Sequence, residues 1–562
     1  MRQSATVSEA VAAVVAAHSD VVFSLMGNGN AHLVAALTAN GHRVVNVRHE
    51  AATVMAAEGY QLSTGRIPTA STTYGAGFAN MLTSLAEARF ARIPMVIVVG
   101  AAPTTGPRAI DFDQDTVAAG FHVPTLLVSR SDAGAVTRRA YAIARRDRVP
   151  VIVALPYDLV DSPVVEPGAG DDIGLPLPPQ EEVLRDHEIE DPQKVTAEQA
   201  QDIVAALRSA QRPLILAGQG AVVAEAGSSL REIGDRIGAL FATSVAASGL
   251  FDSEWDLGIV GGFASPRAAD FAREADVVLV AGASLNLYQM RYNQLLSGAH
   301  TIIQVDTVSG PTNPQVTRFC RADAADAAYA ILEGLGEGSL PGWRAVIDRP
   351  LTGDDDYSGA DFGPDGRLDP RAVMMALNEM LPRERAITQD TGHFMTWATR
   401  HLDGPDTRGK ILPGVALQVI GLGVGSVIGV AAGNPDRLPV LVTGDGGLAM
   451  ELNELDTLVR ETRSCLVVVI NDDAYGMEVH QYGDRGAGLD MTAMRFPEMN
   501  FAAIARAVGG DGVKVRTMDD LKRVREWLED GAEGLFIADV NVSKEVVADW
   551  LDLSNRYNGY TE

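Results

Sequence analysis

The sequence predicts an α/β fold of three domains, each a doubly wound parallel sheet with helices on both faces. Its 562 residues are too many for one hydrophobic core. Short apolar runs alternate with helical patterns along most of the chain, which is typical of parallel sheets. Two segments, 161–193 and 337–370, are rich in proline, glycine and acidic residues and have no apolar period. We therefore interpret them as linkers between the domains.

The first expected domain spans residues 1–165 and shows this alternation most clearly. A helical pattern at 6–18 precedes the strand-like run VVFSL, and a second helix near 31–39 precedes RVVNV. The elements expected next are, in order, the helix HEAATVMAAEGYQLSTG, the strand PTASTT, a helix near 77–90 and the strand PMVIVVG. Such repetition of strand and helix predicts one parallel sheet.

The second and third expected domains follow the same pattern. The second, 194–336, contains the strand-like runs PLILAG, DVVLVAG and TIIQVD, and the third, 371–550, contains LPVLV and CLVVVI. One stretch of the third, 414–433, is apolar enough to be weighed as a membrane span. It holds six glycines and a glutamine, so we interpret it as buried packing around a ligand.

Composition and charge narrow the function classes. The chain has 46 Lys and Arg against 73 Asp and Glu, a formal net charge of −27, which disfavours nucleic acid and anionic membranes as partners. A small-molecule substrate is the expected partner. The N-terminal stretch runs straight into a strand, so we interpret it as a helix of the fold and not a signal peptide. Two cysteines, Cys320 and Cys465, cannot build a disulfide framework and favour a cytoplasmic location.

Two strand-like runs of the third domain end in ligand-type residues beside glycine. The run LPVLV leads into TGDGGLAM, where Asp445 stands between Gly444 and Gly446, and CLVVVI leads into NDDAYG at 471–476. Glycines let the backbone approach a phosphate, and an aspartate there can hold Mg²⁺. Because parallel strands end at the same sheet edge, the pair predicts a metal and diphosphate site. A lone Gly-Asp-Gly would be weak evidence, since it also occurs in turns.

The paired motif, Gly-Asp-Gly followed one strand later by asparagine, resembles that of thiamine-diphosphate-dependent enzymes of the acetolactate synthase, pyruvate decarboxylase and benzaldehyde lyase group. The resemblance covers nearly the whole chain. It implies pyrimidine-binding, middle and diphosphate-binding domains in that order, with thiamine diphosphate and Mg²⁺ as cofactors. It also implies a homodimer as the minimum active unit, and a homotetramer is the expected assembly.

The resemblance assigns the metal ligands with one departure from the family pattern. Asp445 is the first expected ligand, and the Ala474 carbonyl is the third. Where the family usually has its metal-binding asparagine, this chain has Asp472, and a carboxylate is a competent Mg²⁺ ligand. Asn471 is the alternative ligand, one residue earlier.

Glu50 is the expected activating acid. It begins a helix directly after a strand in VVNVRHEAATVMAAEGY, where a glutamate could simply favour the helix dipole. The resemblance implies instead that Glu50 hydrogen-bonds N1′ of the aminopyrimidine and manages the proton that leaves the thiazolium C2. It also implies that the cofactor concerned is held mainly by the other subunit.

The resemblance assigns further cofactor contacts in the third domain. In LQVIGLGVG, Ile420 is the expected apolar wedge that bends the cofactor, and the Gln418 carbonyl is expected to accept its 4′-amino group. Ile420 as ordinary core is the competing interpretation. Gly392 and His393, in QDTGHFMTW, match the turn that contacts the diphosphate. The other expected cofactor contacts are Gly444, Gly446, Gly447, Asn471, Tyr475 and Gly476.

Four residues bear on the chemistry itself. Asn28, in SLMGNGNAHLVAAL, stands where decarboxylases have an acid, and Gln114, in AIDFDQDTVAAGF, replaces their tandem histidines as a polar contact. Glu478 stands where decarboxylases carry a catalytic glutamate, and His480 lies two residues on. This combination favours a carboligase or C–C lyase, a transferase or lyase acting on 2-oxo or 2-hydroxyacyl substrates. The alternatives are a simple 2-oxo acid decarboxylase and a non-catalytic ligand-binding relative.

The middle domain offers a weaker signal for a second cofactor. In PLILAGQGAVV a Gly-x-Gly follows a strand, as in dinucleotide-binding turns, but the third glycine of that fingerprint is missing. Acetolactate synthases hold FAD in this domain, and other relatives hold an ADP group or nothing. The stretch GASLNLYQMRYNQL does not resemble the expected FAD-binding pattern. FAD is therefore an open alternative that the sequence does not favour.

Overall fold

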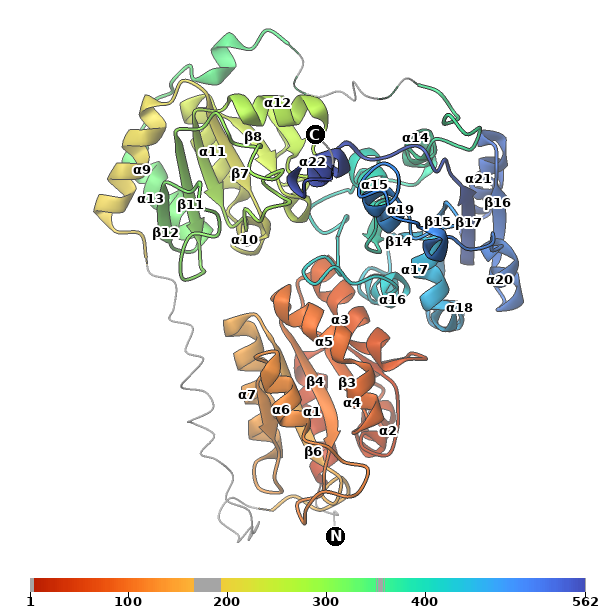
Figure 1. The fold of residues 1–562 in the computed structure, drawn as a ribbon. Helices are drawn as coiled ribbons and strands as arrows, with labels where there is room; N and C mark the ends of the chain where they lie inside the picture. The colour runs from red at the N-terminus through yellow and green to blue at the C-terminus, as the bar shows by residue number, and fades with distance from the viewer. Residues whose placement is uncertain (1–4, 166–193, 350, 352–356, 358, 561–562) are drawn as a thin grey trace.

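The computed structural model describes residues 5–165, 194–349, 351, 357 and 359–560, and it contains three parallel sheets in three domains (Figure 1). Two sheets have six strands and the third has five, and all strand pairs within them are parallel. The predicted fold class is therefore confirmed. The exact domain boundaries stay a prediction.

The first domain has the strand order β2-β1-β3-β4-β6-β5. Its strands are β1 Val21–Ser24, β2 Arg43–Asn46, β3 Thr69–Thr72, β4 Met95–Ala101, β5 Thr125–Leu127 and β6 Pro150–Pro156. Its helices are α1 Val7–His18, α2 Ala31–Ala39, α3 Glu50–Thr64, α4 Ala76–Asn80, α5 Leu82–Phe90, α6 Gln114–Gly120 and α7 Ala133–Asp147. Thr6 and Glu9 form a capping box that starts α1. The single helix expected near 77–90 is interrupted at Met81, which separates α4 from α5.

The middle domain has the strand order β12-β11-β10-β7-β8-β9. Its strands are β7 Pro213–Ala217, β8 Leu240–Thr243, β9 Asp256–Ile259, β10 Val277–Ala281, β11 Thr301–Asp306 and β12 Arg318–Arg321. Its helices are α9 Ala197–Ser209, α10 Gln219–Val223, α11 Gly227–Ile237, α12 Pro266–Glu274 and α13 Ala324–Leu335. The three strands expected from the sequence are the long buried ones, β7, β10 and β11. The others have four residues each, and the two edge strands among them are only partly buried.

The third domain has the strand order β13-β14-β15-β17-β16. Its strands are β13 Arg385–Gln389, β14 Leu438–Gly444, β15 Ser464–Asn471, β16 Asp511–Val515 and β17 Gly534–Asn541. Its helices are α14 Pro370–Met380, α15 Met395–His401, α16 Gly423–Gly433, α17 Asp445–Met450, α18 Leu455–Glu461, α19 Gly476–Tyr482, α20 Phe501–Ala507, α21 Lys522–Glu529 and α22 Asp549–Tyr557. The last helix, α22, lies between the middle and third domains (Figure 1).

The two segments expected as linkers, and the stretch considered as a membrane span, can be compared with the structure. Most of the first expected linker, 166–193, lies outside the described residues. In the second, Trp343 is buried and packs edge-on against Phe271 of the middle domain. The stretch 414–433 is a loop followed by α16, and no helix among the described residues is long and apolar enough to cross a membrane.

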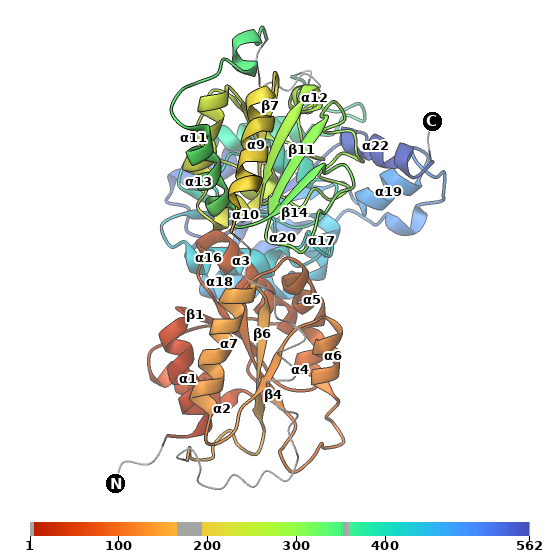
Figure 2. The same ribbon diagram turned by 90° about the vertical axis from the view of Figure 1, so that its left-hand side faces the viewer.

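The first and third domains meet where α3 and α16 cross with their backbones in direct contact (Figure 2). A Cβ atom on Gly429 of α16 would overlap the carbonyl of Ala56 on α3. A Cβ atom on Gly59 of α3 would overlap the carbonyl of Ser426 on α16. Glycine at both positions is therefore needed for the helices to approach this closely.

We expect Gly429→Ala to lower the free energy of unfolding by about 1–3 kcal/mol, because the added methyl group must push two backbones apart. Denaturant unfolding followed by circular dichroism measures the change. Gly310→Ala is the matched control, since a Cβ atom there meets nothing within 4 Å. Equal stability of the two variants would contradict this account of the helix crossing.

Candidate active site

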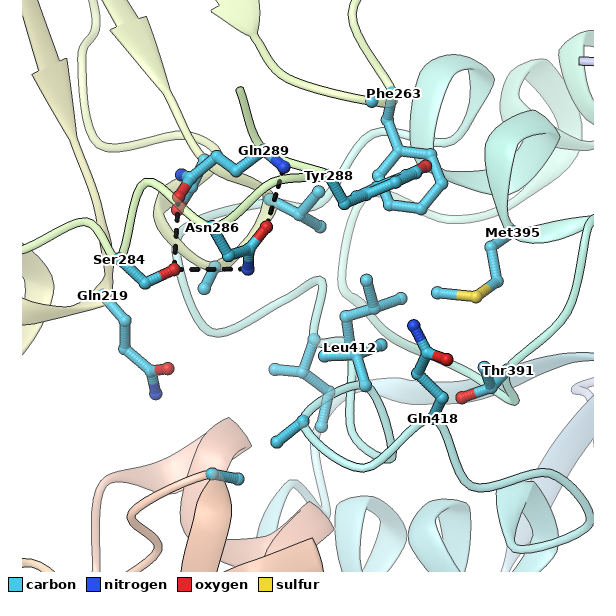
Figure 3. Close-up of a pocket in the computed structure, with 18 of the residues that line it drawn as sticks. Gln219, Phe263, Ser284, Asn286, Tyr288, Gln289, Thr391, Met395, Leu412 and Gln418 are labelled. Atoms are coloured by element: carbon cyan, nitrogen blue, oxygen red, sulfur yellow. Dashed lines mark hydrogen bonds between the residues drawn. The ribbon is translucent and has the colours of Figure 1, made fainter. Parts of the chain in front are cut away.

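A cavity of about 1370 Å³ opens where the three domains meet. The middle and third domains line most of it from the carboxyl ends of their strands, and α3 and α5 of the first domain close one side. Figure 3 shows one part, with Ser284, Asn286 and Gln289 of the middle domain across from Thr391 and Gln418 of the third. Clefts at the carboxyl edge of parallel sheets are common ligand sites.

Most of the cofactor, metal and catalytic residues predicted in the third domain line this one cavity. They are Gly392, His393, Gln418, Ile420, Gly444, Asp445, Gly446, Gly447, Asp472, Ala474, Tyr475, Gly476 and Glu478. Strands β14 and β15 pair in parallel with Gly444 opposite Ile470, so the two motifs end at the same sheet edge. Asn471 and His480 do not line the cavity.

Asp445 is buried and Asp472 is half-buried, and among the described residues neither carboxyl group forms a salt bridge. Burial, together with the charge of Asp472, raises the pKa of Asp445 to about 8. Burial also raises the pKa of Asp472 to about 7. The nearby cations Lys544 and Arg367 each bind Asp473 instead, at 3.0 Å. A divalent cation would relieve the repulsion between the first two carboxylates.

The surroundings of the two carboxylates fit a metal site of mixed ligands. Among the described residues, no group of three or more His, Cys, Asp or Glu side chains is arranged to hold a metal. Two carboxylates and the Ala474 carbonyl would instead supply three oxygen ligands, and substrate phosphates commonly complete the sphere of Mg²⁺. A Cβ atom on Gly476 would overlap the Asp472 carboxylate, so glycine there lets Asp472 keep its position.

Asn471 makes different contacts from its neighbour. Its side chain is fully buried, its amide group donates to Asp539 at 2.8 Å, and its oxygen accepts from the backbone N–H of Asp473 at 3.3 Å. Both ends of the side chain are therefore occupied within the domain. These contacts favour Asp472 over Asn471 as the metal ligand, and the assignment stays a prediction.

The two histidines predicted for the site form a buried pair. The rings of His393 and His480 lie 4.8 Å apart, and Nε2 of His393 accepts from the backbone N–H of Ala548 at 3.2 Å. Burial lowers the pKa of His393 to about 3 and that of His480 to about 4. Both are uncharged near neutral pH. His480 therefore lies behind the cavity wall as a neutral group, while Glu478 faces the cavity.

The three candidates of the first domain lie together, but outside the cavity. Gly29, next to Asn28, donates from its N–H to Thr73 Oγ1 at 2.9 Å. Gln114 accepts from the N–H of Gly75 and donates to the carbonyl of Gly100. Oε1 of Glu50 would lie 3.2 Å from a Cβ atom on Gly77. All three residues thus surround the loop that follows β3, at the carboxyl edge of the first sheet.

Two residues that the sequence did not single out hold Glu50 and its helix in place. Asn80 donates from its side chain to Glu50 Oε2 at 2.9 Å. Glu454 of the third domain accepts the backbone N–H of Arg48 with both carboxylate oxygens, at 2.9 and 3.1 Å. The sequence shows Glu454 only as an acidic residue in the segment after the Gly-Asp-Gly motif. Nothing in the sequence indicates that it binds the backbone of Arg48.

Comparison with known proteins identifies the family. Residues 5–118 match the N-terminal thiamine pyrophosphate (TPP) binding domain of thiamine pyrophosphate enzymes, 200–327 match their central domain, and 390–538 match their C-terminal TPP binding domain. The chain belongs to the thiamine pyrophosphate enzymes. The predicted resemblance, including the order of the three domains, is therefore confirmed.

Several relatives resemble this thiamine pyrophosphate enzyme along most of their length. The acetolactate synthase large subunit of Parasynechococcus marenigrum is 29% identical, over 85% of this chain and 77% of the relative. The acetolactate synthase large subunit of Haemophilus influenzae is 25% identical, over 90% and 89%. The sulfoacetaldehyde acetyltransferase of Rhodobacter capsulatus is 26% identical, over 94% and 92%.

In this thiamine pyrophosphate enzyme, the middle-domain end of the cavity is polar. Ser284, Asn286 and Gln289 hydrogen-bond to one another at 2.8–3.3 Å (Figure 3). Gly218 and Gly282 lie so close that a Cβ atom on Gly218 would overlap the Gly282 carbonyl. Close packing between two loops therefore explains why Gly218, the first glycine of the Gly-x-Gly after β7, carries no side chain. That FAD is not favoured there stays a prediction.

The metal ligands can be tested by substitution. We expect Asp445→Ala to abolish Mg²⁺-dependent binding of thiamine diphosphate, because the site loses one of its two carboxylates. Asp472→Ala should weaken binding far more than Asn471→Ala, whose main effect should be lower stability. Isothermal titration calorimetry with thiamine diphosphate and Mg²⁺ measures the affinities, and thermal unfolding measures stability. Unchanged affinity in Asp445→Ala, or a larger loss in Asn471→Ala, would contradict the assignment.

Proposed function

We propose that this thiamine pyrophosphate enzyme is a Mg²⁺-dependent carboligase or C–C lyase that acts on 2-oxo acid or 2-hydroxyacyl substrates. The observation that carries the proposal is the single cavity lined by Asp445, Asp472, Gln418, Ile420 and Glu478. The curated relatives named acetolactate synthase and sulfoacetaldehyde acetyltransferase support this reaction class.

The third domain would hold and orient the cofactor. Bound thiamine diphosphate would supply a thiazolium carbon that becomes nucleophilic when it loses its proton. Asp445, Asp472 and the Ala474 carbonyl would hold the Mg²⁺ that binds the diphosphate, next to the cavity-lining Gly392 and His393.

The ring end of the cofactor would lie against a separate loop. Ile420 is 39% exposed and lines the cavity, which suits an apolar wedge better than a core residue. Gln418 has a left-handed backbone, with φ of 58°. Its carbonyl would accept the amino group of the pyrimidine.

Glu50 would manage the proton of the aminopyrimidine. Its Oε2 accepts from Asn80, and among the described residues its Oε1 has no hydrogen-bond partner. Oε1 is therefore available to share a proton with N1′. Because Glu50 lies outside the cavity of its own chain, we propose that it serves the cofactor of a partner subunit.

A second subunit would complete each site, which makes a homodimer the minimum active unit and a homotetramer the expected assembly. Apolar side chains are exposed near Asn28 and Gln114 in the first domain: Met26 is 59% exposed, Ile110 64% and Phe112 41%. Exposed apolar groups of this kind suit a subunit interface.

The two buried, unbridged cysteines support a cytoplasmic location.

Side chains at the reacting end would decide the fate of the acyl group. Glu478 faces the cavity and would orient the carbonyl of the acceptor, while the neutral His480 lies behind it. Asn28 and Gln114 would contact substrate only from the partner subunit, and both polar ends of Gln114 are already bound to backbone. Few groups of the protein would then be placed to donate a proton at the reacting carbon, which favours ligation over simple 2-oxo acid decarboxylation. A non-catalytic binding protein would need neither Glu50 nor Glu478.

Glu50→Gln should slow hydrogen exchange at the cofactor C2 by about 10²–10⁴-fold with little change in cofactor affinity, because a general acid–base group is lost. NMR after acid quench measures the exchange. Mixed dimers of a Glu50→Gln chain and an Asp445→Ala chain should recover one intact site and about half the wild-type exchange per dimer. No recovery would contradict the sharing of sites between subunits, and wild-type exchange in the Glu50→Gln homodimer would remove Glu50 from the mechanism.

Product ratios distinguish ligation from decarboxylation. Given a 2-oxo acid and an excess of aldehyde or second 2-oxo acid, we expect the wild type to form more acyloin-type product than free aldehyde. Glu478→Gln should slow ligation without restoring aldehyde release, since an amide side chain is not a general acid and would supply no proton at the reacting carbon. Chromatography of the products measures both. Free aldehyde as the main wild-type product would favour the decarboxylase alternative.

A further inference from the structure

The loop before α16, residues 414–421, has an unusual backbone. Gly414 and Gly421 have positive φ values of 79° and 72°, and Gln418 has a φ of 58°. A residue other than glycine rarely adopts this left-handed region, and it persists there only where the surrounding structure holds it. The loop carries Gln418 and Ile420, the expected contacts of the cofactor ring. Something in the chain must therefore fix its shape.

Buried carboxyl groups hold this loop along its length. Glu87, on α5 of the first domain, accepts the N–H of Ala416 at 2.9 Å and that of Leu417 at 2.6 Å. Glu58, on α3, accepts the N–H of Gly414 at 3.4 Å. Both glutamates are fully buried. They belong to the same chain as the loop, so the first domain contacts the cofactor loop of its own subunit.

A third carboxyl group holds the far end of the loop. Asp390, at the end of β13, accepts the N–H of Gly421 at 3.1 Å. Within the loop, Val419 donates from its N–H to the Gly414 carbonyl at 2.8 Å. Gln418 therefore stands between one point fixed by the first domain and another fixed by the third.

Backbone amides are the hydrogen-bond partners of the two glutamate carboxyl groups among the described residues. No salt bridge to either glutamate is present among the described residues. Burial raises the pKa of both groups, most strongly for Glu58, which also feels the charge of Glu87. The amides of Ala416 and Leu417 oppose the rise at Glu87. Glu87 is thus the better placed of the two to remain ionised, and charge-assisted hydrogen bonds are the stronger kind.

We propose that Glu87, supported by Glu58, is a positioning residue that shapes the cofactor loop of its own subunit. The first domain would then have two roles in two different sites. It would hold the loop at the cofactor of its own chain through Glu87, and it would supply Glu50 to the cofactor of its partner. This inference rests on the proposed function for the roles of Gln418, Ile420 and Glu50.

Hydrogen–deuterium exchange of the cofactor-free protein tests the contact directly. Glu87→Gln keeps the size of the side chain, but its amide nitrogen cannot accept, so one loop N–H loses its acceptor. We expect amide exchange in peptides covering 414–421 to rise about 10- to 100-fold, which corresponds to the loss of one hydrogen bond to a charged group. Glu333→Gln, at an exposed glutamate of α13, is the matched control. Unchanged exchange in Glu87→Gln would overturn the proposal.

The cofactor-bound enzyme gives a second measurement. We expect Glu87→Gln to slow C2 hydrogen exchange by about 10- to 100-fold at saturating cofactor, for the same lost hydrogen bond. Adding Gln418→Gly should recover part of this loss, because glycine adopts positive φ without strain. If Glu87 served only overall stability, the glycine would bring no recovery, and that result would overturn the proposal. If Glu87→Gln does not fold, Glu87→Asp, which keeps the charge on a shorter side chain, takes its place.

A mixed dimer separates this inference from the proposed function. In a dimer of one Glu87→Gln chain and one Glu50→Gln chain, both defects should fall in the same site if Glu87 acts within its chain and Glu50 acts across. One site would then be intact, and about half the wild-type C2 exchange is expected. If this dimer shows C2 exchange near zero while the Glu50→Gln and Asp445→Ala dimer still recovers about half, the proposed role of Glu87 is overturned and the shared site is not. Failure of both mixed dimers would instead count against the shared site of the proposed function.

Discussion

The direct contact between the backbones of α3 and α16 is the constraint on which the rest of this structure depends. Glycines at 59 and 429 permit it, and each would clash with the opposite helix if it carried a Cβ atom. Helix α3 begins at Glu50, and α16 begins just after the loop that carries Gln418. The crossing therefore fixes two elements at once: the acid that would serve one cofactor and the loop that would bend another. Because both helices are rigid, the distance between these elements is set by packing and not by flexible side chains.

Three glutamates at the junction of the first and third domains accept from backbone amides, and among the described residues none of the three forms a salt bridge to lysine or arginine. Glu87 accepts from two loop amides. Glu451 accepts from the backbone N–H of Val424 at 2.7 Å, and Glu454 accepts from the backbone N–H of Arg48. Burial raises the pKa of all three acids. An amide belongs to the backbone that it orients, whereas a lysine would bring a flexible chain of its own. These acids thus fix the conformation of loops and helix starts, and Asp445 and Asp472 are left to attract a metal.

The sequence predicted the fold, and the sheet edge at which the Gly-Asp-Gly and NDDAYG motifs meet, because both depend on local patterns. Long apolar runs such as β14 and β15 are visible as strands, whereas β8, β9 and β12 have four residues each and were not singled out. The resemblance gave Asp472 as the expected metal ligand with Asn471 as the alternative, but the contacts that occupy both ends of the Asn471 side chain involve residues that the sequence does not bring together. Glu87 was not predicted because a single acid in a helix resembles a solvated one. Its partners, Ala416 and Leu417, lie more than 300 residues away in the sequence.

The division of labour within the first domain has a physical consequence for assembly. Contacts from Glu87 and Asp390 fix the cofactor loop within one chain, so the loop would be preorganised before a second subunit binds. Proton transfer through Glu50 would require that second subunit, because the carboxylate lies outside the cavity of its own chain. Cofactor orientation and cofactor activation would therefore depend on different interfaces, one inside the chain and one between chains. A subunit whose cofactor loop is already shaped would then remain inactive until its partner supplies Glu50, which would confine proton transfer to the complete site.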